Sequence, residues 1–206
     1  MRVIAGTAKG RPLHAPRGLA VRPTSDKIKG AIFSMLESIM AARRPQAEEE
    51  AEIADVWEGR RVLDLYAGSG ALAIEALSRG AAQADLVEAS PAACRVIRRN
   101  LAETGLADRA RLYCLTVQSA LAGDSVLRKG SGYDIITLDP PYADPTITDV
   151  VRTLAGSGML RAHALVVVEH SRRVPLAEEY GSLARIRDRT HGDTTVTVYE
   201  NQEAST

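Results

Sequence analysis

The stretch that most constrains the fold is Arg61–Gly70, an apolar run that ends in a glycine turn. Residues 62–65 are apolar and β-prone apart from one Asp, which predicts a strand buried on both faces. Gly68 and Gly70 follow, where the backbone can turn sharply and approach a ligand closely. Residues 71–78 are strong helix formers with apolar side chains at helical spacing. Strand, turn and helix predict the first half of a nucleotide-binding βαβ unit, with helix N–H groups facing the ligand.

The chain beyond this unit alternates β-prone apolar runs with amphipathic helical segments. The seven expected strands are 62–65, 84–88, 109–115, 133–139, 164–170, 182–187 and 194–199. Further helices are expected at 91–103, 117–122 and 144–154. This alternation predicts an α/β fold with a mainly parallel seven-stranded sheet and helices on both faces.

Length and composition set the outer bounds. A chain of 206 residues can form one α/β domain with a small appendage. No apolar run approaches the roughly 20 residues of a membrane span, and the start lacks a signal-like segment. We interpret Cys94 and Cys114 as reduced core residues of a cytoplasmic protein. The formal net charge of zero argues against nucleic-acid binding through bulk electrostatics.

The zero net charge hides a basic N-terminus. The first 30 residues carry seven Lys or Arg against one acid, Asp26, whereas residues 31–60 are acidic. A basic arm on a neutral domain suits phosphate contact, although a solvated, poorly ordered terminus explains the charge equally well. We expect a small hairpin and then a helix that docks the arm onto the main domain. The expected units are a basic arm with its docking helix at 1–40, an acidic connector at 41–60, the main domain at 61–200 and a disordered tail at 201–206.

The first set of candidate site residues surrounds the glycine turn. Glu88 ends the second expected strand, twenty residues beyond Gly68, where an acid can accept hydrogen bonds from ribose hydroxyls. Ala73 completes a Gly-x-Gly-x-x-Ala pattern, so an NAD-dependent oxidoreductase is an open alternative. However, Asp64 would repel a pyrophosphate and accept from an ammonium group, and the turn has no Lys or Arg. The pattern favours S-adenosylmethionine over NAD, with a purely structural turn as the third reading.

The second set is the motif Asp139-Pro-Pro-Tyr142, at the carboxyl end of the fourth expected strand, where open parallel sheets bind ligands. Pro140 and Pro141 immobilise the backbone, and the Asp carboxylate with a proline carbonyl offers two acceptors for an exocyclic amine. Tyr142 can stack on a base, worth roughly 1–3 kcal/mol. The alternative is a strand ended by Pro-Pro with Tyr142 packed as a lid.

Together these motifs resemble those of the RsmD-type methyltransferases. The resemblance covers most of the chain and is carried by the glycine turn, the Asp-Pro-Pro-Tyr motif, the closing strands and the arm, at 62–72, 75–81, 139–142, 167–170, 192–194, 2–6, 9–11 and 22–27. Members of this family use S-adenosylmethionine to methylate N2 of one guanine in small-subunit (16S) ribosomal RNA. The resemblance implies a Rossmann-like class I methyltransferase fold with S-adenosylhomocysteine as product. It also implies ribosomal RNA as partner, within an assembling small subunit, and a cytoplasmic monomer without metal or membrane.

The resemblance also assigns residues to roles. The residues expected to position the target amine for catalysis are Asp139, Pro140, Pro141 and Tyr142. Those expected to hold the cofactor are Asp64, Tyr66, Ala67, Gly68, Ser69, Gly70, Glu88, Ala89, Thr116, Val117 and Gln118. Those expected at the RNA are Lys9, Arg11, Arg22, Thr24, Asp26, Lys27 and Lys29. Other readings stay open: methylation of a different exocyclic amine, in DNA adenine or another RNA, and a non-catalytic RNA-binding factor.

Overall fold

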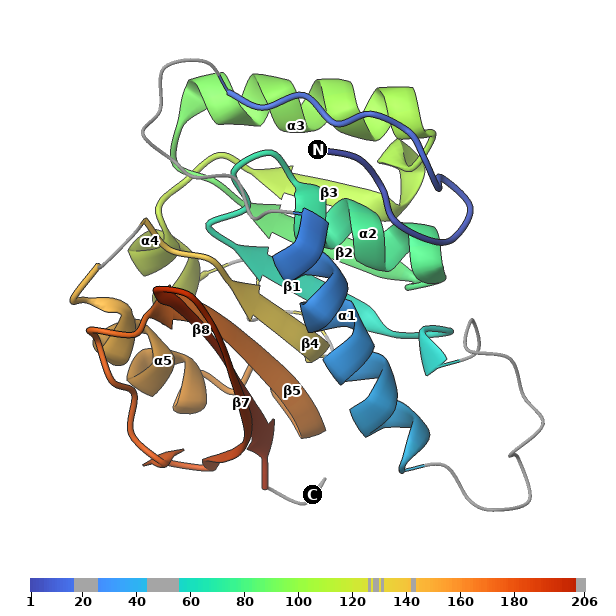
Figure 1. The fold of residues 1–206 in the computed structure, drawn as a ribbon. Coiled ribbons are helices and arrows are strands. Elements are labelled where there is room, and N and C mark those ends of the chain that lie inside the picture. The colour runs from blue at the N-terminus through green and yellow to red at the C-terminus, as the bar shows by residue number, and fades with distance from the viewer. Residues whose placement is uncertain are drawn as a thin grey trace.

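The computed structural model describes residues 1–16, 26–43, 56–125, 127, 130, 132–141 and 144–202. Within them one eight-stranded sheet lies between two layers of helices (Figure 1). The helices are α1 (Asp26–Ala41), α2 (Ala71–Arg79), α3 (Pro91–Thr104), α4 (Val117–Leu121) and α5 (Ile147–Ala155). The strands are β1 (Arg61–Leu65), β2 (Gln83–Val87), β3 (Ala110–Tyr113), β4 (Tyr133–Leu138), β5 (Leu160–Ser171), β6 (Glu179–Tyr180), β7 (Leu183–His191) and β8 (Thr194–Asn201).

The sheet has the order β3-β2-β1-β4-β5-β8-β7-β6. Strands β1 to β5 pair in parallel, so their carboxyl ends meet at one edge, which we call the carboxyl edge. Strand β8 runs antiparallel to β5 and β7 antiparallel to β8, so β7 also ends at the carboxyl edge. The expected count of seven strands is wrong by one. The additional strand, β6, has two residues, too few to show an alternating pattern.

Each face of the sheet carries its own apolar core. One face, which we call the arm face, packs against α1, α2 and α3 through side chains such as Phe33 and Ile97, and Val196 and Val198 of β8 point into it. The other face packs against α4 and α5 and receives Tyr199 of the same strand. Strands buried on both sides explain why β1 and β4 read as continuous apolar runs rather than alternating ones.

Residues 1–16 fold back on themselves and lie along α2. The expected small hairpin is present as a short antiparallel pairing without regular strands: a bridge joins Arg2 and Pro12, and Leu13 N donates to Met1 O at 3.0 Å. The turn between them rests on the carboxyl end of α2, where Thr7 N donates to Ser78 O at 2.8 Å. Gly6 at this contact has φ 79°, and a Cβ there would lie 1.8 Å from Ser78 O. Only glycine fits so close an approach, so the turn is fixed at the end of α2 remote from the glycine turn.

A buried charged network joins this arm to α1 and α2. Glu75 accepts the N–H groups of Ile4 at 2.8 Å and Ala5 at 2.9 Å, the Nε of Arg79 at 2.9 Å, and pairs with Lys29 Nζ at 3.2 Å. The side chains of Lys29 and Glu75 are fully buried. Removing one member of such a pair costs roughly 3–5 kcal/mol, because the other charge stays buried. The prediction that Lys29 contacts RNA phosphates is therefore wrong: Lys29 holds α1 against α2.

The expectation of two core cysteines is confirmed for one of them, and the expectations for the connector and the tail remain predictions. Cys94 is buried as expected, but Cys114 is exposed, because it follows β3 at the open edge of the sheet. Arg98 contacts the Cys114 sulfur at 3.3 Å. Most of the acidic connector, residues 44–55, and the tail after 202 lie outside the described residues.

Candidate active site

The backbone after β1 adopts left-handed conformations at three positions. Tyr66, Gly68 and Gly70 have φ values of 64°, 57° and 77°. A Cβ on Gly70 would lie 3.2 Å from the Leu86 side chain, so this glycine serves close packing beneath the turn. A Cβ on Gly68 would meet only Tyr66 O, at 3.8 Å, on a side open to the cavity described below. The two glycines therefore have different roles, packing for Gly70 and ligand access for Gly68.

Glu88 follows β2 and faces the glycine turn. Its Oε2 accepts the N–H of Gly68 at 2.8 Å, and its Oε1 accepts the N–H of Ser90 at 2.7 Å. These two donors fix the carboxylate in place. Because each carboxylate oxygen has two lone pairs, both oxygens can still accept a hydrogen bond from a ligand. A fixed pair of acceptors of this kind suits two neighbouring hydroxyl groups.

Asp64 is a buried carboxylate beneath the same turn. Its Oδ1 accepts from the Thr137 hydroxyl at 2.7 Å and its Oδ2 from the N–H of Ala73 at 3.2 Å. Burial raises the pKa of Asp64 to about 7 against the lowering effect of these hydrogen bonds, and the charges of Asp139 and Glu88 raise it further. A cationic ligand would favour the ionised form. The site thus holds a carboxylate that is poised to ionise when a cation arrives.

Asp139 follows β4 at the same edge. Its side chain, together with Pro141, borders the cavity. The carbonyl of Pro141 accepts the N–H of Asp144 at 3.1 Å. By contrast, the carbonyl of Pro140 accepts no hydrogen bond from the part of the chain that the structure describes. Tyr142, the fourth member of the motif, lies outside the described residues.

A cavity of about 340 Å³ brings these groups together. It is lined by Met1, Ala15, Pro16, Asp64, Tyr66, Ala67, Gly68, Ser69, Ala71, Leu72, Val87, Glu88, Ala89, Ser90, Ala93, Thr116, Val117, Gln118, Asp139 and Pro141. Of the residues expected at the cofactor, every one lines it except Gly70. The described residues that line it include three carboxylates and no Lys or Arg.

Sequence reasoning missed one wall of this cavity. Met1, Ala15 and Pro16 come from the arm, and only the folded path of the arm along α2 brings them here. Ser90 and Ala93 come from the start of α3, where Ser90 caps the helix by accepting the N–H of Ala93 at 3.4 Å. The Pro91 signal for a helix start could have indicated this second group.

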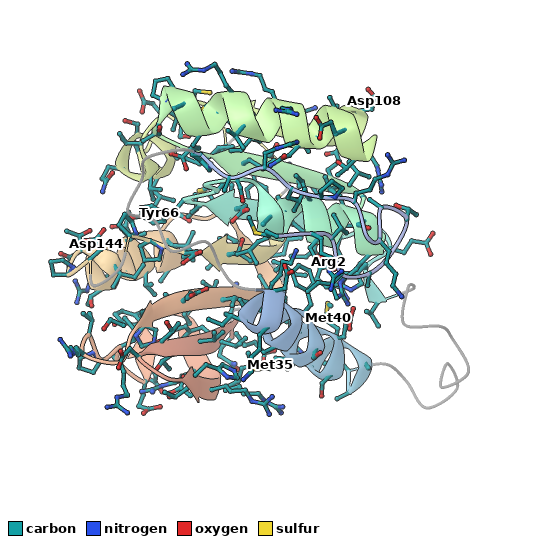
Figure 2. The ribbon with its side chains drawn as sticks, turned by 45° about the horizontal axis from the view of Figure 1, so that its top comes forward. Arg2, Met35, Met40, Tyr66, Asp108 and Asp144 are labelled. Carbon is teal, nitrogen blue, oxygen red and sulfur yellow. The ribbon has the colours of Figure 1, made fainter. Side chains whose placement is uncertain are left out.

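Tyr66 lies at the rim, next to Asp144 (Figure 2). Burial, and then the charge of Asp144, raise the pKa of Tyr66 to about 12. Its hydroxyl is buried and has no hydrogen-bond partner among the described residues. Within the same residues no helix is long and apolar enough to cross a membrane, and no cluster of three His, Cys, Asp or Glu could hold a metal.

The residues expected at the RNA are dispersed. Lys9 and Arg11 are exposed, but they lie at the turn beside the carboxyl end of α2. Since α2 has nine residues, this point is roughly 13 Å along the helix from the glycine turn and at the edge opposite Asp139. Lys27 is exposed at the start of α1, and Asp26 accepts the Arg2 N–H at 3.3 Å. The other two, Arg22 and Thr24, lie outside the described residues.

Comparison with known proteins identifies the family. A sequence model of the family described as "Conserved hypothetical protein 95" matches residues 1–200. The chain belongs to this family, that of the RsmD-type methyltransferases. The resemblance noted from the sequence is thereby confirmed.

Relatives and solved structures of this RsmD-type chain agree. "Ribosomal RNA small subunit methyltransferase D" of Escherichia coli (strain K12) is 30% identical over 202 residues, covering 98% of this chain and 90% of that protein. A Bacillus subtilis (strain 168) protein provisionally named as an rRNA methyltransferase, YlbH, is 35% identical over 98% of this chain and all of that protein. A solved Escherichia coli structure, provisionally described as the methyltransferase yhhF, has a TM-score of 0.77, 28% identity and 99% coverage of both chains. The methyltransferase fold is thus shown, with the mostly parallel α/β sheet that was expected.

Proposed function

We propose that this protein transfers a methyl group from S-adenosylmethionine to N2 of a guanine in small-subunit ribosomal RNA. One observation carries the proposal: a single cavity joins the paired acceptors of Glu88 to Asp139, the first residue of the Asp-Pro-Pro-Tyr motif. The name of the Escherichia coli relative supplies the substrate class. In this proposal the enzyme acts as a cytoplasmic monomer on RNA within an assembling subunit.

The cavity fits S-adenosylmethionine better than it fits a dinucleotide. Its three carboxylates would repel the pyrophosphate of NAD, and none of the described residues that line it is a Lys or Arg that would offset that repulsion. The same carboxylates favour a cationic sulfonium and ammonium group. Gly68 leaves room for close approach, and Glu88 would accept from the two ribose hydroxyls.

Each side of the cavity would hold a different part of the cofactor. Asp64, beneath the turn, lies where a cationic amino-acid tail would be stabilised. Ala93 and Val117 offer apolar surface for the adenine ring, which is flat and largely apolar. When bound, the cofactor supplies a methyl group on a positively charged sulfur, so the protein needs no nucleophile of its own.

The residues after β4 would hold the amine that accepts the methyl group. The Asp139 carboxylate and the Pro140 carbonyl accept the two amine hydrogens, which directs the nitrogen lone pair toward the methyl carbon. As the new bond forms, the amine becomes acidic, and Asp139 accepts the hydrogen bond or the departing proton. A guanine paired in a helix must first leave its stack to reach this point.

A methyl-transfer panel tests the proposal. Radiolabelled S-adenosylmethionine is incubated with the protein and naked 16S rRNA, assembled small subunits, or DNA. We expect label in ribosomal RNA, and calorimetry should show binding of S-adenosylmethionine and not of NADH. Label only in DNA, or binding of NADH alone, would overturn the assignment. Cofactor binding without methyl transfer to rRNA, subunits or DNA would favour the alternative hypothesis of a non-catalytic RNA-binding factor.

A further inference from the structure

Four exposed arginines near the end of the chain carry charge that the protein does not neutralise. Arg172 and Arg173 follow β5, and Arg187 and Arg189 lie on β7; we call these four the arginine cluster. None of the four side chains forms an ion pair or hydrogen bond with the described residues. Arg185, on the same strand, shows the contrast, because it pairs with Asp188 at 2.6 Å and Glu178 at 2.5 Å. The cluster therefore presents positive charge to solvent that no described residue neutralises.

Strand register places Arg189 of the cluster near the proposed methyl-transfer centre. Leu138 of β4 pairs with Val168 of β5, so Asp139 is level with Glu169. Glu169 pairs with Val196 of β8, and Val196 pairs with Arg189 of β7. Three strand spacings of about 4.8 Å separate these positions, so the two backbones are roughly 14 Å apart. Lys9 and Arg11, by contrast, lie at the opposite edge of the sheet.

The same register fixes the side of the sheet on which two of these arginines emerge. Arg187 lies opposite Val198, and Arg189 lies opposite Val196. Directly opposed residues of an antiparallel pair point to the same face, and both valines pack into the arm-face core. Arg187 and Arg189 thus share a face with the arm residues that line the cavity.

Beyond its first two residues, the outer edge of β7 pairs with no strand of the described residues. Strand β6 pairs only with Leu183 and Ala184, and the exposed residues of β7 begin after Arg185. Arginines along an open edge oppose pairing with another strand. Their planar, forked donors match phosphate oxygens instead. Charge complementarity thus favours a nucleic-acid backbone over a peptide strand at this edge.

We propose that the arginine cluster binds the phosphate backbone of the RNA strand whose target guanine lies at Asp139. This inference rests on the proposed function and adds a second contact surface, remote in sequence from the basic arm. Phosphate contacts of this kind fix the position and direction of the strand rather than its sequence. The cluster would thereby hold the substrate on the side of the cavity away from Lys9 and Arg11.

The test compares two matched pairs of substitutions. Arg187→Gln with Arg189→Gln removes two charges from the cluster. The control, Arg95→Gln with Arg111→Gln, removes two exposed arginines on α3 and β3 that also form no ion pair with the described residues. Affinity for a short 16S rRNA fragment containing the methylated guanine is measured by fluorescence anisotropy over a range of salt concentrations. Calorimetry with S-adenosylmethionine and thermal melting check that the cavity and fold are intact.

We expect the cluster variant to bind the fragment about tenfold more weakly and to lower the salt slope by about one per lost phosphate contact. The control variant should bind as the wild type does. An unchanged affinity and salt slope in the cluster variant, or an equal loss in the control variant, would contradict the role of the arginine cluster in RNA binding. The proposed function would still stand if the wild type transfers methyl groups to rRNA. A wild type that neither binds nor methylates rRNA would overturn both. Arg172→Gln with Arg173→Gln gives a second, independent pair for the same measurement.

Discussion

The two sides of the cavity differ in how far apart in the chain their residues lie. Most polar groups of the proposed cofactor side come from one continuous unit, from Asp64 through the glycine turn to Glu88, and Ala93 and Val117 border it from α3 and α4. The rest of the lining brings together the segment after β4 and the arm from the start of the chain, through Met1 and Pro16. Donor recognition is thus a local property of a βαβ unit, whereas substrate recognition depends on the assembled fold.

The largest expected effect is on the target side. Replacing Asp139 by Ala should reduce methyl transfer to rRNA by roughly 10²–10⁴-fold, because the amine loses its acceptor. Affinity for S-adenosylmethionine should stay nearly unchanged. Single-turnover transfer and calorimetry measure the two quantities. Asp149→Asn, at an exposed carboxylate of α5, is the control and should retain full transfer. Unchanged turnover in the Asp139 variant would exclude its catalytic role.

A smaller effect is expected on the cofactor side. Glu88→Gln places an amide where the carboxylate accepts the N–H groups of Gly68 and Ser90. Hydrogen bonds to charged groups contribute about 1.5–3 kcal/mol, so affinity for S-adenosylmethionine should fall by roughly 10- to 150-fold. RNA affinity, measured by anisotropy, should not change. A loss of RNA affinity with cofactor affinity intact would reverse the roles of the two sides.

Proton linkage at Asp64 gives a third, pH-dependent effect. Its pKa of about 7 is raised above its usual value of 3.8, and a cationic ligand binds the ionised form. Affinity for S-adenosylmethionine should therefore weaken by up to about tenfold per pH unit below 7 and level off above it. Calorimetry between pH 5.5 and 8.5 measures the profile, and Asp64→Asn should flatten it. An equally steep profile in that variant would assign the linkage to another group.

The raised pKa of Asp64 also determines how the free energy of unfolding changes with pH. Because the folded state binds the proton of Asp64 more tightly than the unfolded state, this contribution to stability is fully present below about pH 4. It is lost as the pH rises through about 7. Denaturant unfolding of the wild type and of Asp64→Asn at pH 4 and pH 8 measures this contribution. If the stability of the wild type relative to the variant grew with pH, the raised pKa of Asp64 would be contradicted.

The smallest effect is expected from the turn of the arm. Lys9→Gln with Arg11→Gln should change affinity for the short rRNA fragment by no more than about twofold, because charges beyond the Debye length of about 8 Å are largely screened. In the proposed binding mode the fragment lies at the carboxyl edge, whereas these residues lie at the opposite edge. A loss equal to that of the cluster variant would show that the RNA crosses the whole domain.

Sequence patterns predicted the parts of the molecule that are local. Strand β1, its glycine turn and Glu88 are close in the chain, so their relation follows from the βαβ rule. Lys29 could also have been interpreted correctly, because it falls on the apolar stripe of α1 with Ile32, Phe33 and Leu36. The path of the arm could not be predicted from sequence patterns, because it depends on the contact of Gly6 with the end of α2.

The central claim is that the cavity presents a guanine amine to the methyl group. Its most direct test is nucleoside analysis of 16S rRNA after incubation with the protein and S-adenosylmethionine, by liquid chromatography and mass spectrometry. We predict N2-methylguanosine with the wild type and none with Asp139→Ala. Another methylated nucleoside, or N2-methylguanosine formed equally well by the variant, would contradict the claim.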